Sequence, residues 1–412
     1  MLTDRGKLLL VAAPTTWVVG RLLAIPQLWM AAVATVALLA LAVGYARVAS
    51  AQLALRRAVH PQRLFHDADG EVVLDLRNDG RLPTAALVVE DLAPAVLADP
   101  PRFVLDPLPS GATRQLVYPL RGRQRGRYTI GPALVNLRDP FGVAQRPVRF
   151  GGTVEVVVYP PVWALPDVLP PLGRQGTSYD GAPRPVATSG EFANVREYVR
   201  GDDLRKVHWR CTAHRGKLMI KQEESPQDVE ATLLLDVRRD AHRGVGPGST
   251  FEQAVETVAS AAYHLSERRY ALRLVTGAST APLPTTSWRH ILEVLAVIGV
   301  ERGASLRPVW QQLASGLGGN GLLLTVVTPP SPEDLREMVR AGRSFAARVA
   351  VVVAPGGHSG RDRGLLSTER TLLALRGAGW RVTVHRPGQA LDAAWRELAL
   401  RPAGVTPAGV GR

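Results

Sequence analysis

An uncharged run from Leu28 to Ala46 limits what this 412-residue chain can fold into more than any other feature. A helix of nineteen apolar residues reaches across a hydrocarbon core of about 30 Å. Trp29 and Tyr45 lie near its two ends, where amphipathic rings prefer the interface between membrane and water. We therefore predict a transmembrane helix at about residues 28–46.

A second apolar run, at about residues 8–25, comes before it and contains Pro14 and Arg21. Pro26 separates the two runs and favours a tight turn. Cytoplasmic flanks of membrane helices are enriched in Lys and Arg, and both outer ends of this pair are basic. The basic residues are Arg5, Lys7, Arg47, Arg56 and Arg57. Residues 1–59 are thus predicted to form a multi-pass membrane anchor with two transmembrane helices, with the soluble part in the cytoplasm.

Two other interpretations of this region stay open. In one, only residues 28–46 span the membrane, the first run lies at the interface, and the soluble part could face outward. In the other, the first run is a cleaved signal peptide. The second apolar run disfavours a signal peptide, because a soluble segment would normally follow the cleavage site.

The composition sets broader limits. A chain of this length is expected to form two or three domains, since single cores rarely grow past roughly 250–300 residues. Its formal net charge of +14 suits anionic lipid, nucleic acid or acidic partner proteins, or reflects an Arg-rich coding bias without such a partner. The single cysteine, Cys211, excludes an internal disulfide, and no Cys/His spacing indicates a zinc site.

Residues 60–160 consist of short alternating runs separated by turn residues. This pattern predicts an all-β sandwich of the Ig-like kind. The tetrapeptide from Asp139 to Gly142 has the chemistry of a type I turn. Residues 161–189 are rich in Pro and Gly, and we predict a linker there.

The stretch of residues 190–221, called the signature segment here, is the densest in charge, aromatic rings and hydrogen-bonding groups. Asp202 or Asp203 can cap a short helix, on which Arg205, His208 and Trp209 share one face. The candidate site residues of the segment are Glu191, Phe192, Arg196, Tyr198, Arg200, Gly201, Asp202, Arg205, His208, Trp209 and Lys221.

Three roles compete for this segment. It could be an intramolecular clasp in which arginines bind carboxylates, or a surface that docks another protein through Arg, Trp and Tyr anchors. Catalysis by His208 or His214 with Cys211 as nucleophile is the third. No oxyanion-hole loop or nucleophile elbow is recognisable nearby, which disfavours catalysis. Interspersed acidic residues weaken a nucleic-acid role.

Residues 222–400 alternate strand and helix patterns, which predicts a doubly wound α/β domain with a parallel sheet. Ser249 or Thr250 caps one predicted helix, and Ser331 followed by Pro332 begins another. Residues 401–412 are predicted to be a disordered tail.

The signature segment resembles domain-of-unknown-function family 58. The resemblance rests on Glu191-Phe192, Arg196-Glu197-Tyr198, Arg200-Gly201-Asp202, Arg205 to Trp209, and Leu218 to Lys221. It implies a membrane-anchored protein with a von Willebrand factor A-like domain and a MoxR-type AAA+ ATPase as partner.

In metal-binding von Willebrand factor A domains, an Asp-x-Ser-x-Ser loop after the first strand holds a divalent ion. Asp236, Arg238 and Asp240 occupy the corresponding loop here, and both serines are missing. Arg238 brings a cation where the metal would sit, so we predict a degenerate loop without metal. A pair of Asp236 with Arg238 or Arg239 could replace the ion, or Asp236 could be a simple polar strand end.

Together these inferences predict a non-enzymatic scaffold without cofactor that docks proteins at the membrane, namely a MoxR-type ATPase and its client. The alternatives are a cell-envelope enzyme that uses His208, His214 or Cys211, and a binder of anionic lipid or nucleic acid.

Overall fold

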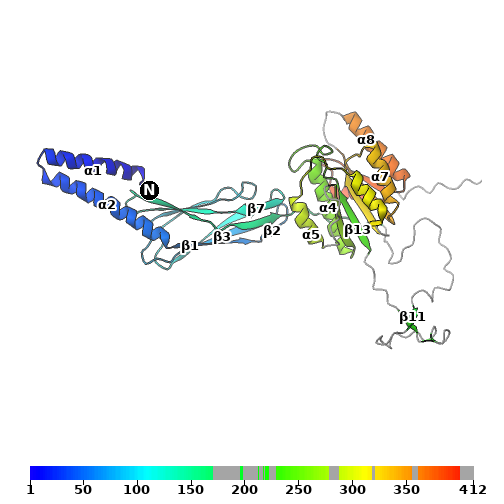
Figure 1. Ribbon diagram of the computed structural model, residues 1–412, viewed down its shortest axis with the longest axis horizontal. Coiled ribbons are helices and arrows are strands. Elements are labelled where there is room, and N and C mark those ends of the chain that lie inside the picture. The colour runs from blue at the N-terminus through cyan, green and yellow to red at the C-terminus, as the bar shows by residue number, and fades with distance from the viewer. Residues whose placement is uncertain are drawn as a thin grey trace, which may run out of the picture. The chain divides into compact units, whose positions relative to one another are not determined.

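The computed structural model divides into two compact units (Figure 1). The first, the β unit, is Met1–Pro161 with Leu292–Ile298, and the second, the α/β unit, is Val162–Ile291 with Gly299–Arg412. The residues that the structure describes are 1–169, 195–197, 212, 217, 219–221, 229–277, 287–317, 321–354 and 361–399.

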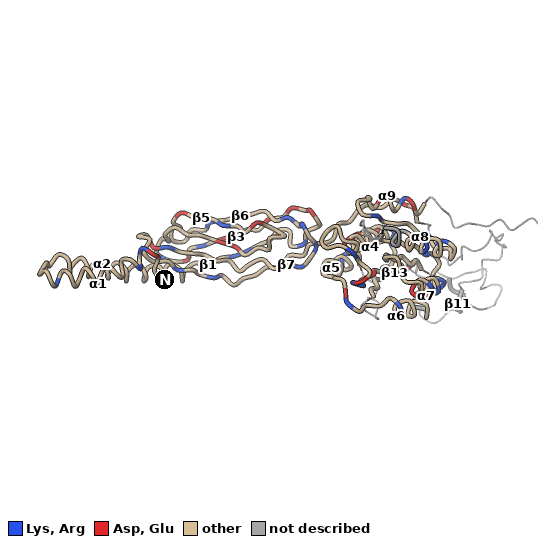
Figure 2. The backbone as a smooth tube through the Cα atoms, turned by 90° about the horizontal axis from the view of Figure 1, so that it is seen from above, with Lys and Arg blue, Asp and Glu red and all other residues tan. Residues whose placement is uncertain are grey.

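Two antiparallel helices, α1 (Asp4–Leu22) and α2 (Pro26–Ala51), form a helical hairpin in the β unit. Among the described residues, α2 is the one helix that is long and apolar enough to cross a membrane. Helix α2 extends past its predicted apolar run at both ends, whereas α1 begins before its run and ends at Leu22, short of the predicted end. Figure 2 draws most of the hairpin without charged residues.

Three sheets follow the hairpin, in the strand orders β1-β3-β6, β2-β10-β7 and β5-β4-β8-β9. The first strand begins two residues after α2 ends, inside the range expected for the anchor. The strands are β1 (Leu53–His60), β2 (Arg63–Leu64), β3 (Asp69–Asn78), β4 (Leu87–Asp91), β5 (Arg102–Leu105), β6 (Thr113–Arg121), β7 (Gly126–Ile130), β8 (Ala133–Arg138), β9 (Gln145–Phe150) and β10 (Val154–Val158).

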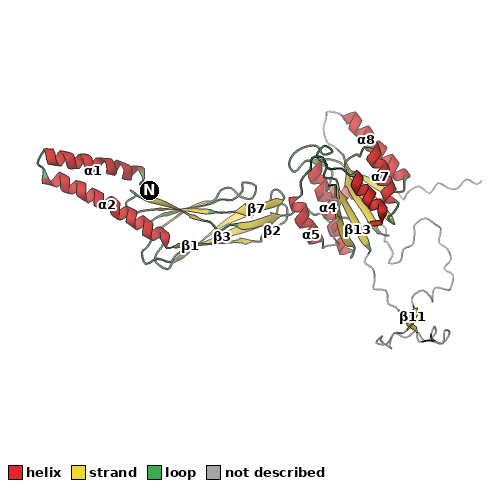
Figure 3. Ribbon diagram, viewed as in Figure 1, coloured by secondary structure: helices red, strands yellow, loops and turns green. Residues whose placement is uncertain are grey.

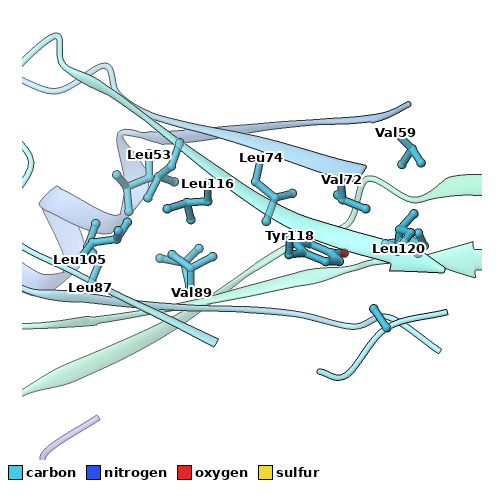
Figure 4. Close-up of a cluster of buried hydrophobic side chains, with 14 of the residues drawn as sticks. Leu53, Val59, Val72, Leu74, Leu87, Val89, Leu105, Leu116, Tyr118 and Leu120 are labelled. Atoms are coloured by element: carbon cyan, nitrogen blue, oxygen red, sulfur yellow. The ribbon is translucent and has the colours of Figure 1, made fainter. Parts of the chain in front are cut away.

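Alternating residues of these strands meet in one hydrophobic core (Figure 4). Along β6, for example, Leu116, Tyr118 and Leu120 are buried while the residues between them are exposed, as the two-residue period of a strand requires. Leu74 of β3 and Val89 of β4 belong to the same cluster, so different sheets share it. The prediction of a β-rich region is confirmed.

A buried ion pair lies within this core. Arg57 of β1 binds the carboxylate of Asp91, at the end of β4, through Nε and Nη2, with Nε 3.1 Å from Oδ2. The hydroxyl of Tyr118 donates to the same oxygen at 2.7 Å. The side chains of Arg57 and Asp91 are 3% and 0% exposed. Burial and the bond to Asp91 both raise the pKa of Tyr118.

The hairpin is fastened to the β unit at both of its open ends. Leu2 forms a β-bridge with Ala144, and the Thr3 hydroxyl donates to the Gly142 carbonyl at 2.7 Å. At the end of α2, the Tyr45 hydroxyl donates to the Pro83 carbonyl at 2.6 Å. The start of α1 and the end of α2 therefore lie against the same unit.

The α/β unit contains a five-stranded parallel sheet in the order β14-β13-β15-β16-β17, which confirms the predicted α/β region with a parallel sheet (Figure 3). Its strands are β13 (Glu230–Leu235), β14 (Ala271–Thr276), β15 (Leu322–Val327), β16 (Ala347–Val353) and β17 (Arg381–His385). The helical segments after residue 229 are α4 (Thr250–Glu267), α5 (Trp288–Val297), α6 (Arg307–Gln312), η2 (Leu313–Leu317), α7 (Pro332–Gly342), α8 (Arg361–Gly377) and α9 (Leu391–Arg396).

Two of the predicted helix starts are present. The Ser249 hydroxyl accepts from the Glu252 amide at 3.2 Å to cap α4, and the Ser331 hydroxyl accepts from the Asp334 amide at 3.1 Å to cap α7. These helices lie on opposite sides of the sheet (Figure 1). The described beginning of the predicted linker, residues 162–169, packs on this unit, where the Trp163 amide donates to Ser260 at 3.0 Å.

Candidate functional site

Most of the signature segment lies outside the described residues. Two short strands are described, β11 (Val195–Glu197) and β12 (Met219–Lys221), and they pair antiparallel, with Val195 opposite Lys221 and Arg196 opposite Ile220. The predicted site residues outside the described range are Glu191, Phe192, Tyr198, Arg200, Gly201, Asp202, Arg205, His208 and Trp209, as are Cys211 and His214.

A polar cluster that contains Asp236 and Arg238 of the predicted loop lies at the carboxyl edge of the parallel sheet. Asp236 directly follows β13, Thr328 directly follows β15, and Asp334 lies in the first turn of α7. Because β13 and β15 are parallel neighbours, their carboxyl ends meet at one edge, where open α/β sheets bind ligands. With Arg238, these three residues are called the strand-end cluster below.

The guanidinium of Arg238 joins the two carboxylates of this cluster. Its Nε and Nη2 donate to Oδ1 and Oδ2 of Asp236 at 3.0 and 2.9 Å, and its Nη1 donates to Oδ2 of Asp334 at 3.1 Å. The first contact is the two-pronged geometry that arginine makes with carboxylates. The expected pair of Asp236 is therefore with Arg238 and not with Arg239, which is exposed.

The remaining hydrogen bonds complete the cluster around Asp236, whose side chain is fully buried. The Arg238 amide donates to Oδ1 at 3.1 Å, and the Thr328 hydroxyl donates to Oδ2 at 3.1 Å. The Ser331 hydroxyl donates to Asp334 at 3.0 Å. A buried carboxylate is costly without such partners, and here four donor groups satisfy it.

The electrostatics keep Arg238 charged. Burial alone would lower the pKa of this guanidinium, but the hydrogen bonds and charge of Asp236, followed by those of Asp334, raise it above its ordinary value. A permanent cation thus fills the space between the two carboxylates. Within the described ranges, no group of three or more His, Cys, Asp or Glu side chains is arranged to hold a metal ion.

His242 links the backbone of Asp236 to the start of α4. Its Nε2 lies 2.8 Å from the Asp236 carbonyl oxygen and its Nδ1 lies 3.1 Å from the Thr250 hydroxyl. The carbonyl can only accept, so Nε2 carries a proton and Nδ1 accepts from Thr250. Burial, mainly, lowers the pKa of His242, and nearby Arg238 and Arg243 add to the effect. The neutral ring therefore holds the loop after β13.

The structure separates the predicted loop residues. Asp236 and Arg238 belong to the strand-end cluster, whereas Asp240 is exposed and its backbone carbonyl accepts from Arg243 at 2.7 Å. Sequence reasoning missed Thr328, Asp334 and His242 as members of the site. The usable signal was positional, since Thr328 directly follows a buried strand and Asp334 lies in the first turn of the next helix.

Comparison with known proteins supports the family resemblance. A family model described as "Protein of unknown function DUF58" matches residues 194–352, less than half of the chain. This range contains the predicted loop, Thr328 and Asp334. No curated protein matches the sequence.

Several solved structures resemble a quarter of the chain weakly. The CARDB domain of a Pyrococcus furiosus protein is 14% identical over 26% of this chain and 86% of its own, with a TM-score of 0.20. Alpha-2-macroglobulin from Escherichia coli is 19% identical over 27% of this chain and 20% of its own, with a TM-score of 0.21. A chain in a human complex of zinc 2-glycoprotein with prolactin inducible protein is 12% identical over 25% of this chain and 92% of its own, with a TM-score of 0.21. At such TM-scores these likenesses carry no argument.

Proposed function

We propose that this chain, which matches the DUF58 family model over residues 194–352, is a membrane-anchored scaffold that binds other proteins and catalyses no reaction. The observation that carries the proposal is the position of Arg238. Its guanidinium occupies the carboxyl edge of the sheet, where an α/β domain would otherwise bind a metal ion or small ligand.

The strand-end cluster favours binding over chemistry because its charged groups are already used. The Asp236 carboxylate accepts from Arg238 and Thr328, and Asp334 accepts from Arg238 and Ser331. A general base must be free to take a proton near its operating pH, and a carboxylate paired in this way is poorly suited to that. The predicted von Willebrand factor A-like, metal-free character of the domain fits this arrangement.

The helical hairpin supplies the anchor in this proposal. Helix α2 has the length and composition of a membrane span. Leu2, before α1, and Tyr45, near the end of α2, both contact the β unit, so a hairpin insertion leaves both ends on one side. The basic residues Arg5, Lys7 and Arg47 flank these ends, and the positive-inside rule then puts the soluble part in the cytoplasm.

The partner follows from the resemblance. A MoxR-type AAA+ ATPase and its client would dock on the signature segment, with Arg200, Arg205 and Trp209 as anchors, since Arg and Trp are enriched in interface hot spots. The Ig-like and von Willebrand-like domains would hold this segment at the membrane surface.

Co-purification with the ATPase encoded in the same cell tests the proposal. The Arg205→Ala/Trp209→Ala variant is expected to lose the ATPase, whereas Arg302→Ala/Arg376→Ala, which removes two exposed cations from the α/β unit, keeps it. Unchanged ATPase recovery with the first variant, in a chain whose circular dichroism matches that of the wild type, would contradict the proposed docking role.

A further inference from the structure

The groove between α7 and α8 has an apolar floor and a basic rim. It has a volume of about 580 Å³ and is lined along α7 from Pro332 to Arg343. Helices α7 and α8 lie side by side in both views of the α/β unit (Figures 1 and 2). Its size is typical of a binding pocket, and it does not include the strand-end cluster.

Four arginines line the groove. Arg336, Arg340 and Arg343 follow one another at helical spacing along α7, so they share one side of the helix, and Arg370 faces them from α8. Within the part of the chain that the structure describes, Arg336, Arg343 and Arg370 form no ion pair. Arg340 lies 3.6 Å from Glu337, and because the arginine is largely exposed this pair has little strength.

Apart from Glu337, the acids of α7 bind arginines outside the groove. In the first turn of α7, Glu333 binds Arg307 at 2.5 Å and Asp334 binds Arg238 at 3.1 Å. The strand-end cluster therefore holds an α7 carboxylate away from the groove. The rim keeps an excess of positive charge as a result, and its natural complement is a row of carboxylates.

The apolar part of the groove favours a protein ligand over a simple anion. Leu335 and Val339 contribute apolar surface on the α7 side. On α8, Leu366 and Leu373 are 60% and 70% exposed and share one side of the helix with Arg370. Large exposed apolar side chains beside a groove mark protein interaction sites, and a phosphate or nucleic-acid backbone would leave them uncovered.

We propose that this groove binds an acidic amphipathic helix of a partner protein. Leucine-type side chains of the ligand fill the floor, and its flanking glutamates bind the arginine forks. A helix of about three turns matches α7, whose eleven residues extend about 16 Å. This is the helix-in-groove mode of peptide recognition. The inference deepens the proposed protein-binding function and rests on it for the kind of ligand.

A designed peptide tests the groove without the ATPase. The probe is a fluorescein-labelled helix of about three turns, with leucines at i, i+4 and i+7 and glutamates beside them. Fluorescence anisotropy with the full chain in detergent micelles is expected to show saturable binding. Arg336→Glu/Arg370→Glu should weaken it at least about tenfold, equivalent to 1.4 kcal/mol. The matched control is Arg302→Glu/Arg376→Glu, since both arginines are exposed and neither lines the groove.

A second variant and three further probes complete the test. Ala374→Trp, which fills the groove from α8 without a change in charge, should also abolish binding. Equal affinity of wild-type chain and both groove variants would overturn the proposal. So would equal binding of a peptide with glutamine in place of each leucine, or competition by phosphatidylglycerol vesicles or duplex DNA at the same charge concentration.

One more result would reassign the groove within the chain. Residues 222–228 contain Glu223, Glu224 and Asp228 and lie outside the described residues. Tighter peptide binding by a Glu223→Gln/Glu224→Gln variant would identify this acidic segment as the occupant and overturn the partner assignment. Failure of the ATPase to co-purify would leave the peptide result unchanged, so the two proposals fail separately.

Discussion

The two units each bury an arginine–aspartate pair, but they use it differently. In the β unit, Arg57 and Asp91 are enclosed by the shared core and Tyr118 completes the hydrogen bonding. In the α/β unit, Asp236 is equally buried, but Arg238 is 17% exposed and reaches a second carboxylate, Asp334. The first pair has one acid and is almost completely buried, whereas the second has two acids and an arginine that is partly exposed.

The two pairs differ in what would happen to the arginine if its aspartate were removed. Arg57 would remain as a buried charge without a carboxylate, with only its hydrogen bond to the Gly152 carbonyl, and a buried unpaired charge is among the costliest arrangements in a protein. Arg238 could turn toward Asp334 and water. The β pair thus joins two sheets of the β unit, whereas the strand-end cluster holds one loop against the start of α7 and keeps an exposed side.

The largest expected effect is that of Asp91→Ala. It leaves Arg57 buried without a carboxylate and is expected to lower the free energy of unfolding of the β unit by about 3–5 kcal/mol. Hydrogen exchange of the full chain, resolved by peptide, measures it as faster exchange in β1, β4 and β6. The exposed Asp106 provides the control, and Asp106→Ala should change little. A loss below about 1 kcal/mol, the size expected of a surface pair, would mean that water reaches Arg57.

Asp236→Ala should cost less, about 2–3 kcal/mol, because Arg238 keeps Asp334 and some contact with water. The same exchange measurement should show protection lost at the carboxyl ends of β13 and β15 and in the first turn of α7. Asp240→Ala, in the same loop but exposed, is the matched control and should be close to neutral. If Asp236→Ala proved as costly as Asp91→Ala, the proposed difference between the two pairs would be wrong.

The smallest expected effect is a pH dependence of the α/β unit. Burial lowers the pKa of His242, His264 and His385 from the ordinary value of 6.5. The unfolded chain therefore binds more protons than the folded chain as the pH falls below 6.5, so stability is full above that pH and is lost toward acid. We expect this loss of stability to be the smallest of the three, because each neutral histidine ring keeps its hydrogen bonds until the pH is low enough to protonate it.

Hydrogen exchange at pH 7.5 and 5.5, corrected for the intrinsic exchange rate, should show weaker protection in β13, α4 and β17 at the lower pH. His242→Gln, which can keep one hydrogen bond without titrating, should reduce the difference near β13. The buried pair of the β unit contains no histidine, so the core around Arg57 is the internal reference. If both units lost protection equally at the lower pH, the buried histidines of the α/β unit would not be the cause.

Local patterns predicted much of the fold. Leu28 to Ala46 indicated α2, the alternation of β6 indicated a half-buried strand, and Ser331 followed by Pro332 indicated the start of α7. Each of these signals depends on residues within a few positions of one another. Strand β1 was missed because its eight residues directly follow the long helix and contain two arginines, which obscured the alternation.

The partners across the sheet could not be predicted in the same way. Asp236 and Asp334 meet because β13 and β15 are neighbours, although β14 lies between them in the chain. That strand order depends on how the whole unit packs. It cannot be predicted from patterns among residues that are close together in the sequence. The Asp236–Arg238 pair was accessible because both residues lie in one loop. The register of β3 with its two neighbours brings Tyr118 close to Arg57, and the packing of a second sheet adds Asp91 of β4.

The fastening of the hairpin has a consequence for how the protein is made. Thr3 binds Gly142, which follows it by 139 positions. A ribosome releases the amino end first, at roughly 5–20 residues per second, so both helices emerge well before the turn that receives Leu2 and Thr3 has been translated. The amino end is therefore made well before the turn that receives it, and it can dock on the β unit only after residue 142 has been translated.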